Sequence, residues 1–373
     1  MVDNPNITIT SIPPPPRKPS SLPFILFAPW KVLFQIYHLT WLLAYRLEAA
    51  QWILVQNPPS IPTLAIAGFV CHLRNSKLMI DWHNYGWTIL AGTRGARHPL
   101  VRISKLYECY LGRLGSFHLT VTNAMARQLR RPPYNIKREM LPVHDRPAAI
   151  FRPVTSPSAR EAILNRVIVE KELVPRILDG SMRLIVSSTS WTPDEDFSIL
   201  LDALTRYAAT SGGPNPPTPI LAVITGKGPQ KEMYLGKIAE LTEAGRLPNV
   251  RITTAFLPFP DYAALLACAD LGICLHMSSS GVDLPMKVVD MFGAGLPVAA
   301  FSNYESFGEL VREGINGRGF ETAGELADIL THLLGTDGHI ELKQLKRGAI
   351  EEGSRRWDEE WDAKVGVIMG LTS

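Results

Sequence analysis

The stretch LGICLHMSSSGVDLPMKVVDMFGAGLPVAAFS, residues 271–302, determines the fold class of this chain. It begins with an apolar strand at 271–275, continues through a loop of small residues, and ends in a second apolar strand at 296–302. Between them we expect a helix that begins at Asp283. Two continuous apolar strands joined by a helix are typical of a parallel β-α-β unit buried on both faces. Such sheets bind ligands at the carboxyl ends of their strands, where a helix start offers backbone N–H groups to phosphate.

The charged residues of this stretch predict a ligand site. Asp283 is a good N-cap residue, and Asp283, Lys287 and Asp290 recur at i, i+4 and i+7, so we expect them on one helix face. Val288 and Met291 would then be buried on the opposite face. A solvated charged stripe is the alternative for this spacing. Because the flanking strands are buried, we favour a charged face that lines a cleft.

Strands and helices alternate along the rest of the chain, which predicts a doubly wound α/β fold. Further strands are expected at 52–56, 76–82, 118–122, 183–188, 219–225 and 249–256. Further helices are expected at 61–73, 101–114, 123–131, 197–207, 230–243, 261–270 and 340–369. The proline-rich segment 132–157 lacks the alternation, and we expect it to connect two domains.

Composition limits the classes of function. A chain of 373 residues is long enough for two ordinary domains. Its net charge of +3 is small and its basic residues are scattered, so we expect no binding to nucleic acid. The four cysteines have neither CxxC nor metal-ligand spacing, and we expect free thiols and a folded part that faces the cytosol.

An apolar segment at 22–47 approaches the length of a membrane span. Pro29 and several polar residues interrupt it, and Trp30, Trp41 and Tyr45 are of the types that prefer the bilayer interface. We therefore expect a helix lying in one leaflet rather than a clean span. A helix packed in an α/β domain with an exposed apolar face is the alternative, and one helix could do both.

Loops that follow other strands of the second half bring more polar groups to the same sheet edge. TGKGPQKE (225–232) supplies glycines and a lysine, and VSSTSWTPDEDF (186–197) ends in an acidic helix start. A plain strand-to-helix turn would explain either loop alone, but their convergence favours a site. We predict that a sugar nucleotide is bound by Ser188, Gly226, Lys227, Gly228, Ser280, Gly281, Asp283, Leu284, Lys287 and Asp290.

The residue types fit that ligand. Asp290 can accept hydrogen bonds from ribose hydroxyls, while Lys287 and Lys227 can neutralise a departing diphosphate. The segment AFLPFPDY (255–262) offers aromatic and proline surface for a base.

In the first half, Asp81 and His83 follow a strand and lie two residues apart, so they share a face in extended chain. Asp81 is a candidate general base for an acceptor hydroxyl, and His83 is a candidate contact to the transferred sugar or the acceptor. A structural, hydrogen-bonded histidine is the alternative.

Several motifs together resemble one family. They are IDWHNYGWTIL (80–90), SSTSWTPDEDF (187–197), ITGKGP (224–229), SSSGVDLPMKVVDMFGAGLPV (278–298) and GELVREGINGRGF (308–320). This set resembles the chitobiosyldiphosphodolichol β-mannosyltransferases of eukaryotic N-glycosylation. No GxGxxG follows the first strand of either half, which disfavours a dehydrogenase-like pair of domains.

The resemblance implies a GT-B architecture, with two Rossmann-like domains facing a cleft. We expect an acceptor-side domain at 1–150, a donor domain at 151–350, and a helix at 351–373 that packs back on the first domain. The resemblance also implies inverting β-1,4 transfer of mannose from GDP-mannose to dolichol-linked chitobiose diphosphate. It places the enzyme on the cytosolic face of the endoplasmic reticulum membrane, without metal or cofactor, and with other dolichol-pathway glycosyltransferases as partners.

The chain departs from the family pattern in three places. Related enzymes carry a pair of glutamates eight residues apart, whereas this chain has Asp283 and Asp290, seven apart, so only Asp290 matches the ribose-binding acid. Related GT-B enzymes carry Arg and Lys in the loop where this chain has Ser190 and Glu195, so Lys287 and Lys227 must supply more positive charge. Members also begin with a membrane anchor, a first strand and a glycine-containing loop, and we expect the first domain here to be incomplete at its amino end. An inactive or weakly active form that acts as a membrane-bound assembly partner is the alternative function, and a transferase using a UDP-sugar is a third.

Overall fold

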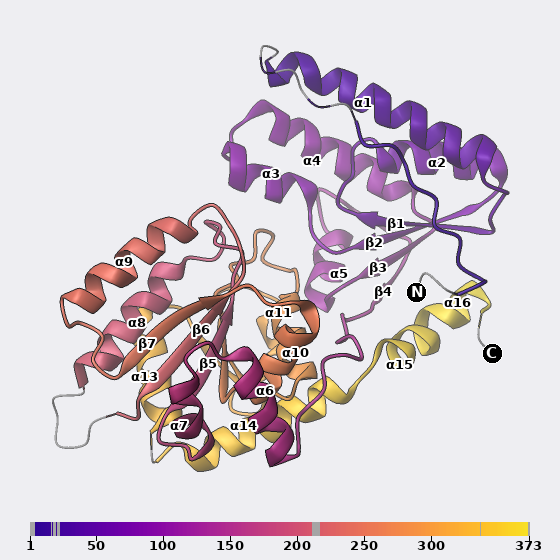
Figure 1. The fold of residues 1–373 in the computed structure, drawn as a ribbon. Helices are drawn as coiled ribbons and strands as arrows, with labels where there is room; N and C mark the ends of the chain where they lie inside the picture. Colours follow the sequence, from indigo (N-terminus) through magenta and orange to yellow (C-terminus); the bar gives the residue numbers. More distant parts are fainter. Residues whose placement is uncertain are drawn as a thin grey trace. The chain divides into compact units, whose positions relative to one another are not determined.

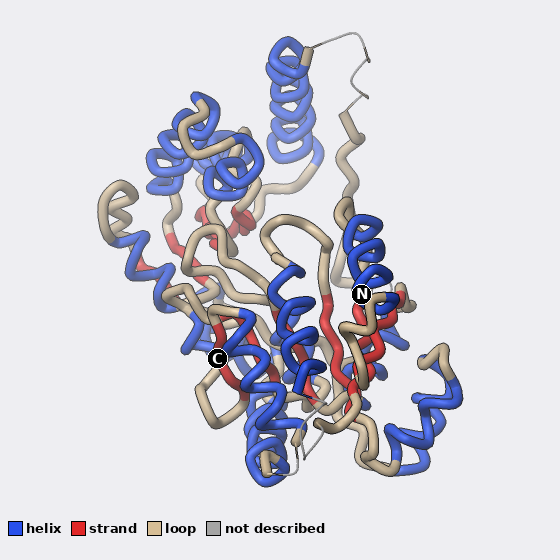
Figure 2. The backbone as a smooth tube through the Cα atoms, turned by 90° about the vertical axis from the view of Figure 1, so that its left-hand side faces the viewer, coloured by secondary structure: helices blue, strands red, loops and turns tan. Residues whose placement is uncertain are grey.

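The computed structural model describes residues 4–15, 17, 20, 23–210, 217–335 and 337–371. Leu22, where the predicted membrane-associated helix begins, lies outside the described residues. The chain divides into two compact units, Met1–Pro142 and Val143–Ser373. Figure 1 shows the elements of each unit, and Figure 2 distinguishes helices from strands by colour. The packing of 351–373 on the first domain stays a prediction.

The first unit is built on a four-stranded parallel sheet in which the strands follow one another in chain order. Its strands are β1 (Trp52–Asn57), β2 (Lys77–Trp82), β3 (Phe117–Thr120) and β4 (Glu139–Pro142). The prediction that 132–157 is only a connection is therefore wrong at β4, which pairs with β3. This strand has four residues and ends in Pro142, so it carries too little apolar alternation to be recognised.

Helices join these strands and cover the sheet. They are α1 (Phe24–Trp41), α2 (Thr63–Arg74), α3 (Gly86–Arg94), α4 (Pro99–Leu111) and α5 (Asn123–Arg130), with a π-helical turn η1 (Leu42–Arg46) after α1. Figure 1 shows α1, α2 and α4 together over the sheet. Local signals fix two helix starts: Pro99 occupies the first turn of α4, and the Thr122 side chain caps α5. The pattern did not predict α3.

The second unit contains a six-stranded parallel sheet in the order β10-β9-β8-β5-β6-β7. Its strands are β5 (Arg183–Ser188), β6 (Ile220–Thr225), β7 (Val250–Ala255), β8 (Leu271–Cys274), β9 (Val298–Phe301) and β10 (Gly317–Phe320). This is the order of a Rossmann fold, whose direction reverses between β5 and β8. Ligands of such sheets bind at that reversal, outside the carboxyl ends of the strands.

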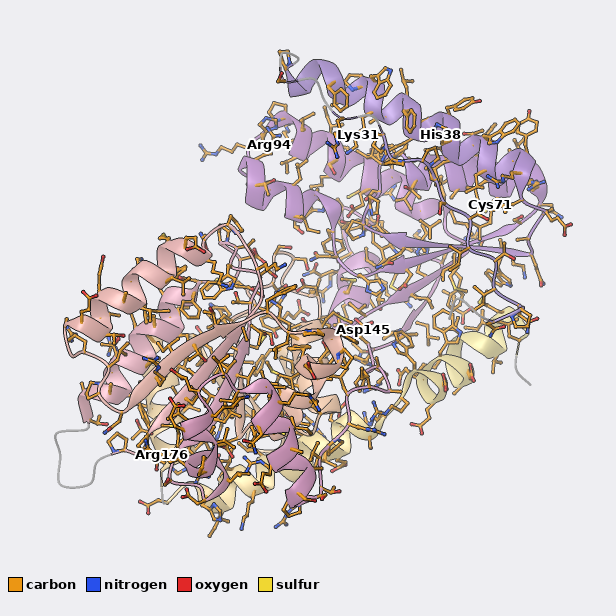
Figure 3. The ribbon with its side chains drawn as sticks, viewed as in Figure 1. Lys31, His38, Cys71, Arg94, Asp145 and Arg176 are labelled. Atoms are coloured by element: carbon orange, nitrogen blue, oxygen red, sulfur yellow. The ribbon has the colours of Figure 1, made fainter. Side chains whose placement is uncertain are left out.

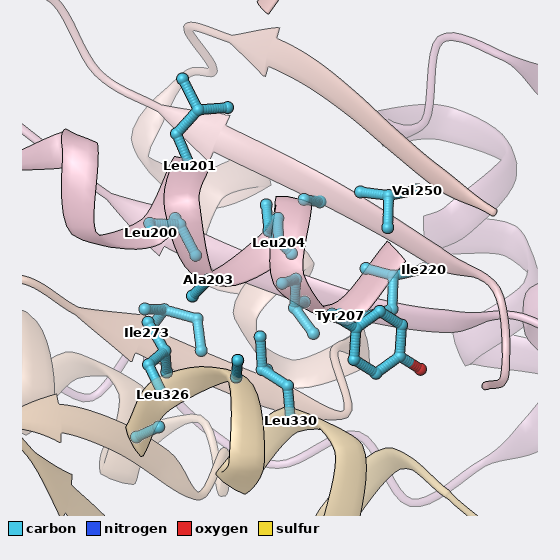
Figure 4. Packing of buried hydrophobic residues seen from close by; sticks show 14 of the residues in the cluster. Leu200, Leu201, Ala203, Leu204, Tyr207, Ile220, Val250, Ile273, Leu326 and Leu330 are labelled. Atoms are coloured by element: carbon cyan, nitrogen blue, oxygen red, sulfur yellow. The ribbon is translucent and has the colours of Figure 1, made fainter. Parts of the chain in front are cut away.

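Helices flank this sheet. The helices of the second unit are α6 (Pro157–Val167), α7 (Val174–Leu178), α8 (Phe197–Ala209), α9 (Lys231–Glu243), α10 (Phe259–Cys268), α11 (Met286–Gly293), α12 (Phe307–Leu310), α13 (Ala323–Leu334), α14 (His339–Ser354), α15 (Trp357–Trp361) and α16 (Val367–Met369). On one face, α8 and α13 pack against the strands through Leu200, Leu204, Leu326 and Leu330, all fully buried (Figure 4). Removing so many apolar side chains from water is the main stabilisation of this unit.

The helix after β8 begins later than predicted. It starts at Met286, with Pro285 as its N-cap residue, so Asp283 is not the N-cap. The Asp283 carboxylate instead accepts a hydrogen bond from the Ser278 hydroxyl and contacts His276 Nε2 at 3.3 Å. Because the helix begins at Met286, only Lys287 and Asp290 of the predicted charged face lie on it. Val288 and Met291 are buried, as the spacing predicted.

Burial of His118 predicts a pH dependence of stability in the first unit. His118 is fully buried, accepts a hydrogen bond from Trp82 Nε1 on Nδ1 at 3.1 Å, and has its pKa lowered to about 4 by burial. An unfolded histidine takes up its proton near pH 6.5, whereas folded His118 stays neutral down to about pH 4. The free energy of unfolding should therefore fall by about 3 kcal/mol as pH falls from 6.5 to 4. The free energy of unfolding, measured with urea between pH 7 and 4, should depend less on pH in His118→Gln, which keeps an acceptor for Trp82. An equal slope in both proteins would contradict this account.

Candidate functional site

The loops that follow β5 and β8 meet at the reversal of strand order in the second unit. Glu195, at the end of the loop after β5, forms an ion pair with Lys287 in the first turn of α11. The Glu195 side chain is 4% exposed and that of Lys287 is 27% exposed. Lys287 Nζ also lies 3.4 Å from Ser190 Oγ. The predicted lysine is therefore held at the sheet edge where the predicted ligand would bind.

Ser188 and Asp290 contribute polar groups to the same edge. Ser188 ends β5, and its hydroxyl lies 2.9 Å from the hydroxyl of Tyr262 on α10. Burial raises the pKa of the Asp290 carboxyl to about 7. Burial also raises the pKa of Tyr262 to about 12, to which the nearby Asp290 charge contributes. Asp290 is therefore a carboxyl that changes charge near neutral pH.

The loop 275–285 after β8 holds the remaining predicted residues, and its own hydrogen bonds define its shape. Gly281 has a φ of +75°, which favours glycine, and its carbonyl accepts from the Glu305 amide at 2.9 Å. Ser280 Oγ accepts from the Val282 amide at 3.4 Å. Asp283 and Leu284 are both buried. These two residues shape the loop from inside.

Gly226 and Gly228 allow two loops to touch. A Cβ at Gly226 would lie 1.8 Å from the Thr189 carbonyl oxygen, and one at Gly228 would lie 1.7 Å from that of Ser190. The loop after β6 therefore packs backbone against backbone on the loop that carries Glu195. Lys227 lies between these glycines and is exposed, with Nζ 3.6 Å from the ring centroid of Phe256. This is a cation–π contact, and it occupies the aromatic surface expected to receive a base.

In the first unit, Asp81 and His83 contact each other at the end of β2. His83 Nε2 lies 2.9 Å from Asp81 Oδ2, and both side chains are partly exposed. When Nε2 donates to Asp81, the neutral imidazole keeps its acceptor lone pair on Nδ1. The pair thus has the composition of an acid–base centre.

Sequence reasoning missed the buried carboxylate of Glu108 beneath this centre. Glu108 is fully buried on α4 and accepts hydrogen bonds from Ser60 Oγ (2.5 Å), the Gly86 amide (2.9 Å) and Tyr134 OH (2.9 Å). Burial raises the pKa of Glu108. Since Gly86 begins α3 directly after the Asp81–His83 turn, Glu108 fixes the backbone that follows this pair. Glutamate on an amphipathic helix gives no signal of burial.

Along α1 and η1, apolar side chains form an exposed row. Its members recur every three or four residues and are 43–75% exposed: Trp30, Leu33, Tyr37, Trp41 and Tyr45. The row lies on a helix that also carries Lys31 and His38 (Figure 3). The Arg74 side chain fastens η1 to α2 through bonds of 2.7 Å to the carbonyls of Leu43 and Leu47. Within the described ranges, no helix is both long and apolar enough to cross a bilayer.

The described residues hold no group of three or more His, Cys, Asp or Glu side chains arranged to bind a metal ion. The four cysteines are free and buried.

Comparison with known proteins finds glycosyltransferases, both in a family model and among individual relatives. Residues 182–336 match the family of group 1 glycosyl transferases. The chitobiosyldiphosphodolichol β-mannosyltransferase of Arthroderma benhamiae is 50% identical over all of this chain and 84% of its own length. The enzymes of that name from Mus musculus and Homo sapiens are 41% and 40% identical, over 91% and 89% of this chain and 74% and 75% of theirs.

Solved structures share the fold at low identity. Anabaena Alr3699/HepE, solved in complex with UDP, matches with a TM-score of 0.65 and 16% identity over 91% of this chain and 82% of its own. Sucrose-phosphate synthase from Thermosynechococcus elongatus matches with a TM-score of 0.63 and 14% identity over 91% and 77%. These matches confirm the predicted α/β GT-B fold.

The contact between the two loops of the second unit can be tested at its glycines. Gly226→Ala should lower the free energy of unfolding by about 2 kcal/mol, because its φ of +126° and the Thr189 carbonyl both oppose a Cβ. Gly236→Ala on α9 is the matched control, since nothing lies within 4 Å of its Cβ position. The free energy of unfolding of this control should rise by about 0.5–1 kcal/mol, because alanine has a higher helix propensity than glycine. Chemical unfolding followed by circular dichroism measures both, and equal effects would contradict the packing argument.

Proposed function

Because this chain belongs to the family of chitobiosyldiphosphodolichol β-mannosyltransferases, we propose that it transfers mannose from GDP-mannose to dolichol-linked chitobiose diphosphate. The chain is a glycosyltransferase with the group 1 domain at 182–336. The observation that carries the proposal is the 50% identity to a relative of that name over the whole chain. The product would be a β-1,4-linked mannoside in the assembly of the N-glycan precursor.

We assign donor binding to the second unit. Lys287 would contact the diphosphate, whose negative charge increases as the bond to mannose breaks. Asp290 in its ionised form would accept hydrogen bonds from the ribose hydroxyls. Ser188 and Tyr262, joined at 2.9 Å, lie on the same edge and supply further hydroxyl groups.

We assign activation of the acceptor to the Asp81–His83 pair in the first unit. The acceptor hydroxyl oxygen would form a bond to C1 of mannose while the bond from C1 to the phosphate oxygen breaks. GDP leaves with the electron pair of that bond, and the hydroxyl proton passes to the Asp81–His83 pair. Because one displacement inverts C1, an α-linked donor gives a β-linked product.

We further propose that the enzyme works at the cytosolic face of the endoplasmic reticulum membrane. The exposed row on α1 and η1 supports this placement, since Trp and Tyr side chains favour the boundary between lipid and water. The four free, buried cysteines agree with a folded part on the cytosolic side. Other enzymes of the dolichol pathway are candidate partners on this membrane.

The decisive measurement is transfer by the purified chain in detergent or lipid. Incubation with GDP-mannose and dolichol-linked chitobiose diphosphate should extend the lipid-linked glycan by one hexose, which a β-mannosidase should remove. Lys287→Ala should lower kcat/KM by about 100-fold if one phosphate contact strengthens in the transition state. Its far-UV circular dichroism should stay unchanged.

Several outcomes would contradict this function. If the wild-type chain binds lipid but forms no product, the assembly-partner alternative is favoured. Stronger thermal stabilisation by UDP than by GDP would indicate a donor of another class. Unchanged turnover in Lys287→Ala would remove that lysine from the reaction.

Asp290 predicts a pH dependence of donor binding. Its folded pKa of about 7 means that the carboxyl is largely neutral at pH 6 and ionised at pH 8. Ionised Asp290 accepts ribose hydroxyls better, so the Kd for GDP-mannose, whose diphosphate keeps its charge in this range, should fall as pH rises from 6 to 8. Asp290→Asn should bind GDP-mannose more weakly at pH 8 and lose this dependence. Calorimetric titration at both pH values measures the Kd. If the variant keeps the pH dependence, another group causes it.

A further inference from the structure

We propose that Glu195 is a positioning residue, which holds the Lys287 ammonium in place to bind the diphosphate of the donor. This inference rests on the proposed function and extends it to a residue that has no expected contact with substrate. It starts from a fully engaged carboxylate at the reversal of strand order.

Both oxygens of Glu195 have partners. Oε1 pairs with Lys287, while Oε2 accepts hydrogen bonds from Thr189 Oγ1 at 2.9 Å and from the Ser190 amide at 2.5 Å. The carboxylate therefore ties the loop after β5 to the first turn of α11. These two segments lie on opposite sides of the strand-order reversal, and Glu195 and Lys287 are 92 residues apart in the sequence.

The two charges differ in their access to solvent. The Glu195 side chain is 4% exposed, so protein covers it, whereas Lys287 keeps 27% of its side chain exposed. An ammonium has three N–H donors, and its partners among the described residues are Glu195 and Ser190. Lysine can thus stay bound to Glu195 while it donates to an incoming phosphate oxygen.

Stability alone is a weak explanation for this pair. A buried ion pair generally stabilises a fold no more than apolar residues of similar volume would. Anchoring does serve binding, because a flexible lysine side chain that is already ordered loses less rotamer freedom when the ligand arrives. Glu195 would therefore act through Lys287 rather than on the donor directly.

A double-mutant cycle tests this dependence. Glu195→Gln keeps the shape but removes the charge, and we expect kcat/KM for GDP-mannose to fall about tenfold. In the Lys287→Ala background, Glu195→Gln should have no further effect on kcat/KM. The same coupling should appear in the Kd for GDP. Additive effects of the two substitutions would overturn the proposal.

Two further measurements separate positioning from a general loss of structure. Lys287→Ala leaves a buried carboxylate without its cation, so its Tm should fall, and adding Glu195→Gln should restore part of it. Glu240 is an exposed glutamate on α9, so Glu240→Gln controls for the change in charge. This control should match wild type in kcat/KM, in the Kd for GDP and in Tm. A fall in kcat/KM of equal size in this control would overturn the proposal.

The proposed function and this inference can fail independently. If wild type binds GDP or UDP but transfers no mannose, the function fails, and the cycle on nucleotide binding still decides the role of Glu195. If wild type transfers mannose and the cycle shows no coupling, the function stands and the inference fails. Binding of neither nucleotide would overturn both.

Discussion

The strand order of the second sheet is the constraint on which the candidate donor site depends. Because β5 lies between β8 and β6, the loops after β5 and β8 begin at neighbouring strands but lead to different helices. Glu195 comes from one of these loops and Lys287 from the helix after the other, so their contact requires both halves of the sheet. Ser188 and Tyr262 meet at the same edge through two other elements. The fold thus brings together groups that are far apart in the sequence.

Features with a local cause could be predicted from the sequence. Buried parallel strands such as 183–188 and 220–225 are short apolar runs, and they lie close to where the pattern placed them. Asp81 and His83 share a face because their spacing matches the strand period, and they do contact each other. Such features depend only on neighbouring residues, which a single sequence contains.

Features with a distant cause could not be predicted. The start of α11 was misplaced for a more local reason, because an aspartate before a helix matches the N-cap pattern, whereas the Asp283 carboxylate is bound by Ser278 and His276 of its own loop. The short strand β10 (Gly317–Phe320) was missed because two of its four residues are glycine. Glu195 stood out because related enzymes carry a basic residue at that place, but its pairing with Lys287 spans 92 residues. Spacing rules cannot show a contact of that range.

The close approach of the loops after β5 and β6 limits how this site could be altered. The carbonyl oxygens of Thr189 and Ser190 occupy the space where side chains at positions 226 and 228 would begin. Any L-amino acid other than glycine there would displace the backbone that carries Glu195. Efforts to redesign the enzyme for another sugar nucleotide should therefore leave both glycines unchanged and vary position 227, whose side chain is exposed.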